Sequence, residues 1–461
     1  MSGGARQTRG ERSGQAIMAA DGHTDQHRGD GTTMATRKTA QANEGRWTAT
    51  QLTAQEMDAL SGSDPLGDFQ QTSQMAALAA KHGSVCSQVG LRDADGHIVA
   101  GAMIAYTPSR FGMAGSIWLG PVCDPDDAAM MAAMSDAIRA DAKRRHAISV
   151  SCWPNLVYRL RASDGTPTEE PHDEYLRAFE RLGWQHQPFT RGYDSVINRW
   201  VYVKDLTPHD TADALLKSYE KRTQWSIERA RSMGVVVREV GADELHVFAD
   251  IERQTAQRRH FAYRGEQYFH DFADAFGDRT HFLIAYIDTA AYEASMRRKA
   301  QRLEELVAGL EEKLAQRETT KLRRRHNEES SNLKAAHKRL DAARELKARG
   351  AMLPAACSLF VTHPNETVYL YSGSVEEYKP FYASALIQHE AMVKLCLDKG
   401  ITRYNFYGID GVFDDPDSEG HGVLEFKQGF NGHVEELVGE FVLPVSRARM
   451  ALRRTLKKVL G

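Results

Sequence analysis

The residues that could do chemistry in this chain concentrate in one stretch, residues 402–444. A short strand-like run ends at Gly408, and an acidic loop punctuated by glycines follows it. The stretch contains one lysine, Lys427, which comes at the exit of this loop directly after Phe426. A loop of about a dozen residues inside a compact domain is usually functional rather than merely connecting. The alternative left open by the pattern is a solvated loop that carries an ordinary surface lysine.

Two other segments carry clusters of positive charge that could bind phosphate. Residues 290–350 hold 16 Lys plus Arg against 10 Asp plus Glu, a net charge of +6. The tail from Ser446 onward holds six Lys and Arg and no acid, which suits a phosphate or an anionic membrane. The alternatives are a solvated helical face for the first segment and a basic amphipathic helix for the second.

The bulk composition limits the class of protein. A chain of 461 residues predicts two or three domains, and its net charge of -3 gives no general attraction to nucleic acid. Five scattered cysteines without metal-ligand spacing indicate a reducing compartment and no structural zinc. The longest apolar run is far shorter than the roughly 20 residues that span a bilayer. Residues 1–45 have no apolar segment and are predicted to be a disordered tail.

Strand and helix patterns alternate through two segments of similar order, which predicts an α+β fold with a duplicated domain. The first domain is expected at 46–205, with the tail 445–461 packed on it, and the second at 206–289 plus 351–444. Between the two parts of the second domain, residues 290–350 repeat Leu and Ala at spacings of three and four. This spacing predicts an arm of two antiparallel helices in a coiled coil.

A series of motifs in the same order resembles the FemABX family of aminoacyltransferases, which build the interpeptide bridges of peptidoglycan. The motifs are LTAQEMDAL, DFQQTS, LGPVCD, ARSMGVVVRE, VYLYSGS, RYNFYGIDG and VLEFKQGFNGHVEELVGEF. The resemblance implies two acetyltransferase-like (GNAT) domains with a coiled-coil arm inserted in the second. It also implies transfer of an amino acid from an aminoacyl-tRNA to the stem-peptide amine of a peptidoglycan precursor.

The implied partners are an aminoacyl-tRNA and a precursor, either lipid II or UDP-MurNAc-pentapeptide, with no metal and no cofactor. The implied location is the cytoplasm, and a peripheral contact with the inner face of the plasma membrane stays open, as does a homo-oligomer or a Fem-family hetero-partner. An acetyl-CoA N-acyltransferase is one alternative, although residues 231–236 depart from the pyrophosphate-binding pattern at their last position. A non-catalytic partner of a Fem enzyme is the other.

The resemblance also implies roles for particular residues. Lys427 and Phe426 would form the active site, with Lys427 contacting the tRNA 3′ end or the oxyanion. Arg264 and Tyr268 would hold the phosphates and sugar of the precursor. Tyr369 and Tyr371 would line the precursor channel, and their alternation on one strand predicts that they point to the same face.

The sequence departs from the family pattern at two positions. Where the family often has a phosphate-binding lysine, this chain has Ala79, and Lys81 is the expected substitute. Where the family tends to have an aspartate, this chain has Trp153. The proton of the attacking amine would therefore go to solvent, to the tRNA or to a carboxylate not identified from the sequence.

Overall fold

The computed structural model describes residues 46–110, 112–193 and 196–446. The predicted disordered tail lies outside these residues, and so does the tail 445–461 predicted to pack on the first domain, except for Val445 and Ser446. None of the described helices combines the length and the apolar composition that a membrane span requires. The description below concerns these residues only.

In the described chain, the first sheet has seven strands in the order β1-β2-β3-β4-β5-β15-β7. Neighbouring strands are antiparallel except β4 and β5, which run parallel. The strands are β1 (Thr48–Gln51), β2 (Val85–Arg92), β3 (Ile98–Ser109), β4 (Gly112–Trp118), β5 (Ala147–Trp153), β7 (Gln185–His186) and β15 (Phe441–Pro444). The helices of this part are α2 (Ala54–Ser63), α3 (Ser73–Lys81), α4 (Ala128–Arg144) and α5 (Asp173–Arg181), with a short 3-10 turn η1 (Phe69–Gln71).

The second sheet has eight strands within the described residues, in the order β6-β14-β8-β13-β12-β11-β10-β9. It also contains one parallel pair, β12 with β13, among antiparallel neighbours. The strands are β6 (Val157–Arg161), β8 (Trp200–Asp205), β9 (Val235–Glu239), β10 (Thr280–Asp288), β11 (Met352–His363), β12 (Glu366–Ser374), β13 (Arg403–Ile409) and β14 (His433–Leu437). The recurrence of a single parallel pair in each sheet supports the duplicated fold that the element order predicted.

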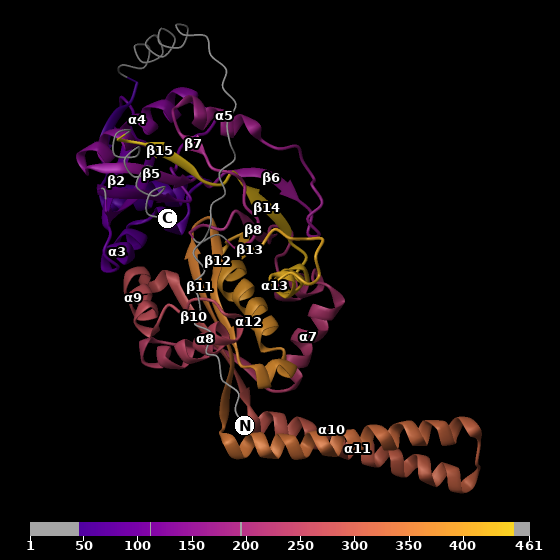
Figure 1. The fold of residues 1–461 in the computed structure, drawn as a ribbon. Helices are drawn as coiled ribbons and strands as arrows, with labels where there is room; N and C mark the ends of the chain where they lie inside the picture. The colour runs from indigo at the N-terminus through magenta and orange to yellow at the C-terminus, as the bar shows by residue number, and fades with distance from the viewer. Residues whose placement is uncertain (1–45, 111, 194–195, 447–461) are drawn as a thin grey trace, which may run out of the picture. The chain divides into compact units, whose positions relative to one another are not determined.

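Helices cover both faces of the second sheet (Figure 1). One face packs its apolar side chains against α6 (Ala212–Lys217), α7 (Lys221–Ser232) and α12 (Ala383–Ala391). The other face packs against α8 (Leu245–Arg259) and α9 (Glu266–Phe276). Phe69 and Leu78, from the first part of the chain, join this second core, so the two halves share buried apolar surface.

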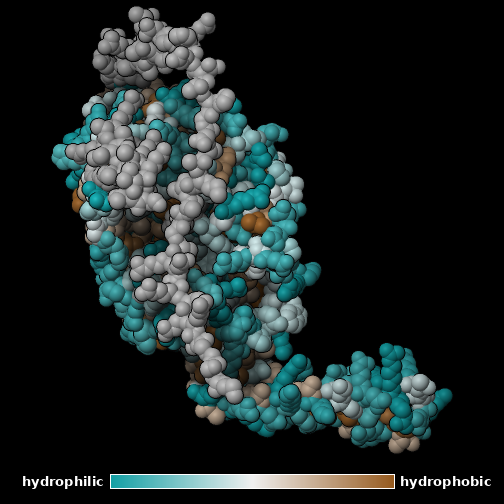
Figure 2. Space-filling model, in the orientation of Figure 1, coloured by the Kyte–Doolittle hydropathy of each residue, from teal (hydrophilic) through white to brown (hydrophobic). Residues whose placement is uncertain are grey.

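The arm predicted from the Leu and Ala spacing is present as α10 (Thr289–Gln316) and α11 (Thr320–Arg349), two helices side by side between β10 and β11 (Figure 1). Leu310 of α10 is buried, as are Leu340 and Ala343 of α11, and all three are positions of the predicted seam. Val307, which the Leu and Ala pattern did not include, is buried as well. On the face drawn in Figure 2 the arm is largely hydrophilic, as expected for helices that bury only their shared seam. The α+β class, the two successive mixed sheets and the inserted arm are therefore confirmed.

Sheet membership does not follow the boundary predicted at residue 205. Strands β6 and β8 come from the segment assigned to the first domain but pair within the second sheet. Strand β15 comes from the end of the chain and pairs with β5 in the first sheet. Local patterns predict strands but not their long-range partners, so this exchange was not foreseen. The domain boundaries themselves stay a prediction.

Candidate active site

A cavity of about 970 Å³ lies where β12 and β13 separate. The two strands pair only at Thr367 with Tyr404 and at Val368 with Asn405. Beyond this point both strands contribute to the cavity wall, together with α8, the 261–264 connection and the helix α13 (His421–Gln428). Of the predicted site residues, the cavity brings together Lys427, Phe426, Arg264, Tyr369 and Tyr371.

Lys427 lies on α13 and is only 4% exposed, so the alternative of an ordinary surface lysine is wrong. Its Nζ donates hydrogen bonds to the carbonyl oxygens of Gly408 (2.6 Å) and Tyr407 (3.2 Å). Burial lowers the pKa of Lys427 to about 7, and no carboxylate of the described chain forms an ion pair with it. The predicted loop therefore contains a helix that buries a cation without a counter-ion against the cavity.

An irregularity in β13 turns the two carbonyl groups toward Lys427. The pairing of β13 with β8 shifts between Asn405 and Gly408, and Tyr407 adopts a left-handed backbone with φ of 62°. Asn405 stabilises this turn because its Oδ1 accepts a hydrogen bond of 2.8 Å from the Tyr407 amide. At Gly408 a Cβ atom would lie 2.2 Å from Nδ2 of Asn198, so a larger residue there would displace the Asn198 side chain. The left-handed backbone of a non-glycine residue such as Tyr407 costs roughly 1–3 kcal/mol, and such residues cluster at functional sites.

Phe426 borders the large cavity and also a second cavity of about 340 Å³. Its ring packs edge-on against Phe430 with centroids 5.4 Å apart. The second cavity is lined by Arg222, Lys379 and the first residues of α12, among others. Phe426 therefore stands at the boundary between two concave sites, as a residue that separates two substrates would.

Tyr369 and Tyr371 both line the large cavity, but the prediction that they share a face of the sheet is wrong. The pairing of β12 with β11 shifts, so that Tyr369 is opposite Phe360 whereas Tyr371 is opposite Leu359. Tyr369 stacks on Phe360, while Tyr371 packs edge-on against Phe269 in the core of the other face. A β-bulge at Leu370 breaks the two-residue alternation on which the prediction relied. Burial raises the pKa of Tyr369 to about 12.

Arg264 and Tyr268 lie close together at the start of α9. The Arg264 side chain is exposed at the cavity, and its guanidinium carbon lies 5.7 Å from the centre of the Tyr268 ring. Tyr268 is not part of the cavity wall; its hydroxyl lies 3.3 Å from that of Tyr371. Burial raises the pKa of Tyr268 well above its usual value, so the phenol stays neutral. The geometry suits Tyr268 for positioning Tyr371 rather than for direct contact within this cavity.

The structure does not bring Lys81 or Trp153 to the cavity wall. Lys81, at the end of α3, lies 2.9 Å from Asp274 and 3.6 Å from Asp271 on α9. The hydrogen bond to Asp274 raises the pKa of Lys81. Lys81 thus joins the two helices through exposed ion pairs, and its role as a phosphate ligand stays a prediction.

Glu252 is a cavity residue that the sequence interpretation missed. Its side chain is 1% exposed, and it lines the same cavity as Lys427 and Arg264. The available signal was the helical spacing of α8, in which Glu252 follows the buried Phe248 by one turn and so falls on the apolar face. A carboxylate on an apolar helix face needs a partner or a function.

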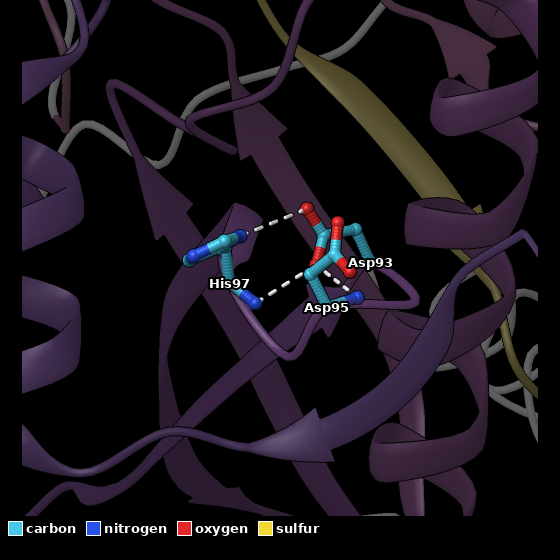
Figure 3. Close-up of side chains that lie close together, drawn as sticks. All are labelled: Asp93, Asp95 and His97. Atoms are coloured by element: carbon cyan, nitrogen blue, oxygen red, sulfur yellow. Dashed lines mark hydrogen bonds and ion pairs between the residues drawn. The ribbon is translucent and has the colours of Figure 1, made fainter.

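Within the described residues, one group of side chains could hold a metal ion: Asp93, Asp95 and His97, between β2 and β3. Figure 3 shows that the Asp93 carboxylate already faces the turn that it closes, where it accepts hydrogen bonds from the amides of Asp95 (3.0 Å) and His97 (2.8 Å). The residues form the turn that connects β2 to β3, and none of them lines the large cavity. A structural role in the turn accounts for this group.

Comparison with known proteins gives the same class of protein as the fold. The model of the FemAB family matches residues 52–458. The chain is 28% identical over 417 residues to aminoacyltransferase FemB of Staphylococcus epidermidis, covering 89% of this chain and 98% of the relative. It is 27% identical over 418 residues to aminoacyltransferase FemA of Staphylococcus aureus, again covering 89% and 98%.

A crystal structure of FemX has the same fold, with a TM-score of 0.69 and 22% identity over 86% of this chain and 97% of that one. Two mixed sheets that share a core therefore define the same fold class as FemX. The chain belongs to the FemAB family.

Proposed function

We propose that the protein transfers an amino acid from an aminoacyl-tRNA to the stem-peptide amine of a peptidoglycan precursor and so builds an interpeptide bridge. Membership of the FemAB family and the similarity to two proteins named aminoacyltransferase support this function. The observation that carries it is Lys427, a buried cation in a large cavity with two carbonyl partners and no counter-ion among the described residues.

The contacts of Lys427 suit the stabilisation of a developing negative charge. An ammonium group has three N–H donors, and the carbonyls of Tyr407 and Gly408 accept two of them. The third donor is available to a substrate oxygen in the cavity. When an amine attacks the aminoacyl ester, the carbonyl oxygen becomes an oxyanion, which favours the charged form of a neighbouring lysine. Lys427 would then supply the fixed positive charge that the transition state needs.

The cavity wall offers suitable contacts for the precursor. Arg264 presents an exposed guanidinium, which binds the paired oxygens of a diphosphate through its planar fork. Tyr369 and Tyr371 each contribute to the cavity lining a phenol ring with a polar tip, which suits a sugar and a peptide. In this arrangement the diphosphate lies at the 261–264 connection and the peptide amine extends toward Lys427. The acceptor can be lipid II or UDP-MurNAc-pentapeptide, and the reaction belongs in the cytoplasm or at the inner membrane face.

A basic and aromatic surface leads from the second cavity along α7 and fits the end of a tRNA. Arg222 lines this cavity, and Trp225, one turn further on, is 52% exposed with its ring against Tyr382, another lining residue. Arg229 follows after one more turn. Cations alternating with an exposed aromatic ring are typical of single-stranded nucleic-acid binding, because the ring stacks on a base.

The positive charge continues onto the base of the arm. Burial lowers the pKa of Lys299 on α10, and three nearby guanidinium groups lower it further. They belong to Arg339, Arg229 and Arg302. A cluster of four like charges is costly unless an anion binds to it. We infer that phosphates of the tRNA acceptor stem lie here. Phosphate binding by the cations at the far end of the arm, such as Arg323 and Arg324, stays a separate prediction.

A transfer assay with a pool of charged tRNAs and purified precursor, analysed by mass spectrometry, tests the function. The expected product is a precursor that has gained one amino-acid residue, and treatment of the tRNA with RNase should abolish it. Transfer that survives RNase would contradict tRNA dependence. Saturable binding of acetyl-CoA in calorimetry, together with acetylated product, would favour an acetyl-CoA N-acyltransferase instead.

A further inference from the structure

Glu252 is a buried carboxylate that faces the cavity and is not explained by packing. Helix α8 approaches β12 so closely at Gly373 that a Cβ atom there would lie 2.8 Å from the carbonyl oxygen of Ile251 and 3.0 Å from the amide nitrogen of Glu252. The Thr255 hydroxyl holds this contact by accepting a 2.9 Å hydrogen bond from the amide of Ser374. The backbone beneath Glu252 is therefore fixed against the strand that forms the cavity wall.

The carboxylate has an unsatisfied oxygen. Its Oε2 is buried and has no hydrogen-bond partner among the described residues. The groups that act on it electrostatically are Arg264 from the connection before α9, Tyr263 beside it and Cys357 on β11. Burial raises the pKa of Glu252 to about 7, and only the Arg264 charge acts in the opposite direction. A buried carboxylate oxygen without a donor is costly, so a ligand that supplies N–H groups would satisfy it.

We propose that Glu252 binds the primary ammonium of the acceptor substrate in the cavity and takes one proton from it before transfer. The inference rests on the proposed function, since it assigns the acceptor end of the same cavity. It also supplies the carboxylate that the sequence did not show, because Trp153 occupies the position where an aspartate was expected and does not line the cavity.

The proton balance of the reaction is complete with one carboxylate. The acceptor enters as R–NH₃⁺ and pairs with the Glu252 carboxylate, which takes one proton and leaves a neutral amine. The amine nitrogen bonds to the ester carbonyl carbon, and the negative charge on the carbonyl oxygen faces Lys427. The bond from this carbon to the ribose oxygen of the tRNA then breaks, and the second proton of the nitrogen goes to that oxygen. Glu252 returns its proton to solvent after the product leaves.

The variant Glu252→Gln tests this assignment because it keeps the shape of the side chain and removes the basic oxygen. The matched control is Asp250→Asn, an exposed carboxylate on the same helix that does not line the cavity. With the acceptor concentration varied, E252Q should lower kcat/KM by about 100-fold or more, the usual contribution of general-base catalysis. Its rate should rise steadily with pH as free amine becomes available, whereas the wild-type rate should level off above about pH 7. D250N should behave like the wild type.

A binding measurement separates this inference from the proposed function. Calorimetry would compare a precursor with a free acceptor amine and the same precursor with that amine acetylated. The wild type should prefer the free amine by at least about 10-fold and E252Q should not, whether or not any charged tRNA supports transfer. Equal preference in both proteins, or a wild-type pH profile in a folded E252Q, would overturn the role of Glu252. A wild type that discriminates between the amines but never transfers would contradict only the transferase function.

Discussion

Lys427 and Glu252 place two buried charges of opposite sign in one cavity, and neither forms a direct ion pair among the described residues. Each residue is expected to reduce the stability of the free protein, since the charged form loses its hydration on folding. Retaining such groups suits a site that gains its partners from two substrates. Their effects on stability should have opposite pH dependences, which makes them separable by experiment.

The variant Lys427→Met should lower the transfer rate by about 100- to 1000-fold, because it removes the proposed donor to the oxyanion while keeping the aliphatic stem. The pKa of Lys427 is lowered from 10.5 to about 7, so the folded protein binds this proton less tightly than the unfolded chain does. The loss of folding stability caused by the buried ammonium is therefore full below pH 7 and disappears as the pH rises to about 10.5. Urea unfolding should show K427M to be more stable than the wild type at pH 6, with a smaller difference at pH 9. A loss of activity accompanied by lower stability at pH 6 would contradict this view.

The variant Glu252→Gln should show the opposite trend in stability. The pKa of Glu252 is raised from 4.5 to about 7, so the folded protein holds this proton more tightly than the unfolded chain does. The loss of folding stability caused by the buried carboxylate is absent below pH 4.5, grows between pH 4.5 and 7, and is full above pH 7. At pH 8, E252Q should therefore be more stable than the wild type by on the order of 3 kcal/mol, at about 1.36 kcal/mol for each pKa unit. The check is urea unfolding at pH 5 and pH 8; equal differences at both pH values would contradict the shift.

At the scale of elements, α7 connects the second cavity with the arm and should control the affinity for tRNA. Trp225→Ala should raise the Kd for aminoacyl-tRNA about 10-fold, because stacking of one base contributes roughly 1–3 kcal/mol. Arg229→Gln should weaken binding and reduce the salt dependence of the affinity by about one phosphate contact. The affinity for precursor should not change in either variant. Trp225→Phe is the matched control and should retain most of the binding; filter binding across a salt series distinguishes these outcomes.

The elements themselves show which features a sequence can predict. The arm could be predicted because Leu and Ala recur every three or four residues around Leu310 and again around Leu340, and a helical seam is such a local periodic pattern. The bulge at Leu370 and the left-handed Tyr407 did not follow, because strand pairing across the sheet sets them. Helix α13 was not predicted, because its eight residues are surrounded by glycines and acids that are typical of a loop. A motif in the sequence singled out Lys427 as a candidate, whereas its burial without an ion pair among the described residues could be seen only in the folded structure.

At the scale of the whole molecule, an ionic network lies within the second sheet and reaches the first half of the chain. Arg403 on β13 forms a bidentate pair with Glu435 on β14, at 2.6 and 2.7 Å, and a 2.8 Å contact with Glu366 on β12. Asp68 precedes the 3-10 turn η1 and is buried near Glu366. Burial and the neighbouring Glu366 charge both raise the pKa of Asp68. The contact of Asp68 with the paired Glu366 therefore ties η1 to the second sheet. The halves of the fold are joined by polar contacts as well as by the shared core around Phe69.

Strand exchange predicts that the two halves cannot fold separately. A fragment of residues 46–205 lacks β15, which pairs with both β5 and β7 in the first sheet. The same fragment retains β6 and β8, whose sheet partners β13 and β14 lie beyond residue 400. Its buried residues Trp200 and Tyr202 would lose the core formed with Phe406 and Phe430. The fragment should therefore stay unfolded or aggregate, since the exposed strand edges and apolar faces have no cover.

The intact chain should instead unfold as one unit, because each sheet needs strands from both ends of the sequence. Circular dichroism and tryptophan fluorescence should give coincident urea transitions for the full protein and no transition for the fragment. The informative control is a chain in which a short turn replaces residues 306–335. This change removes the far end of the arm, keeps the 2.7 Å contact between Glu304 and His337, and leaves all strands in place. It should keep the single transition, whereas a fragment 46–205 that unfolds cooperatively would show that the first sheet closes without β15.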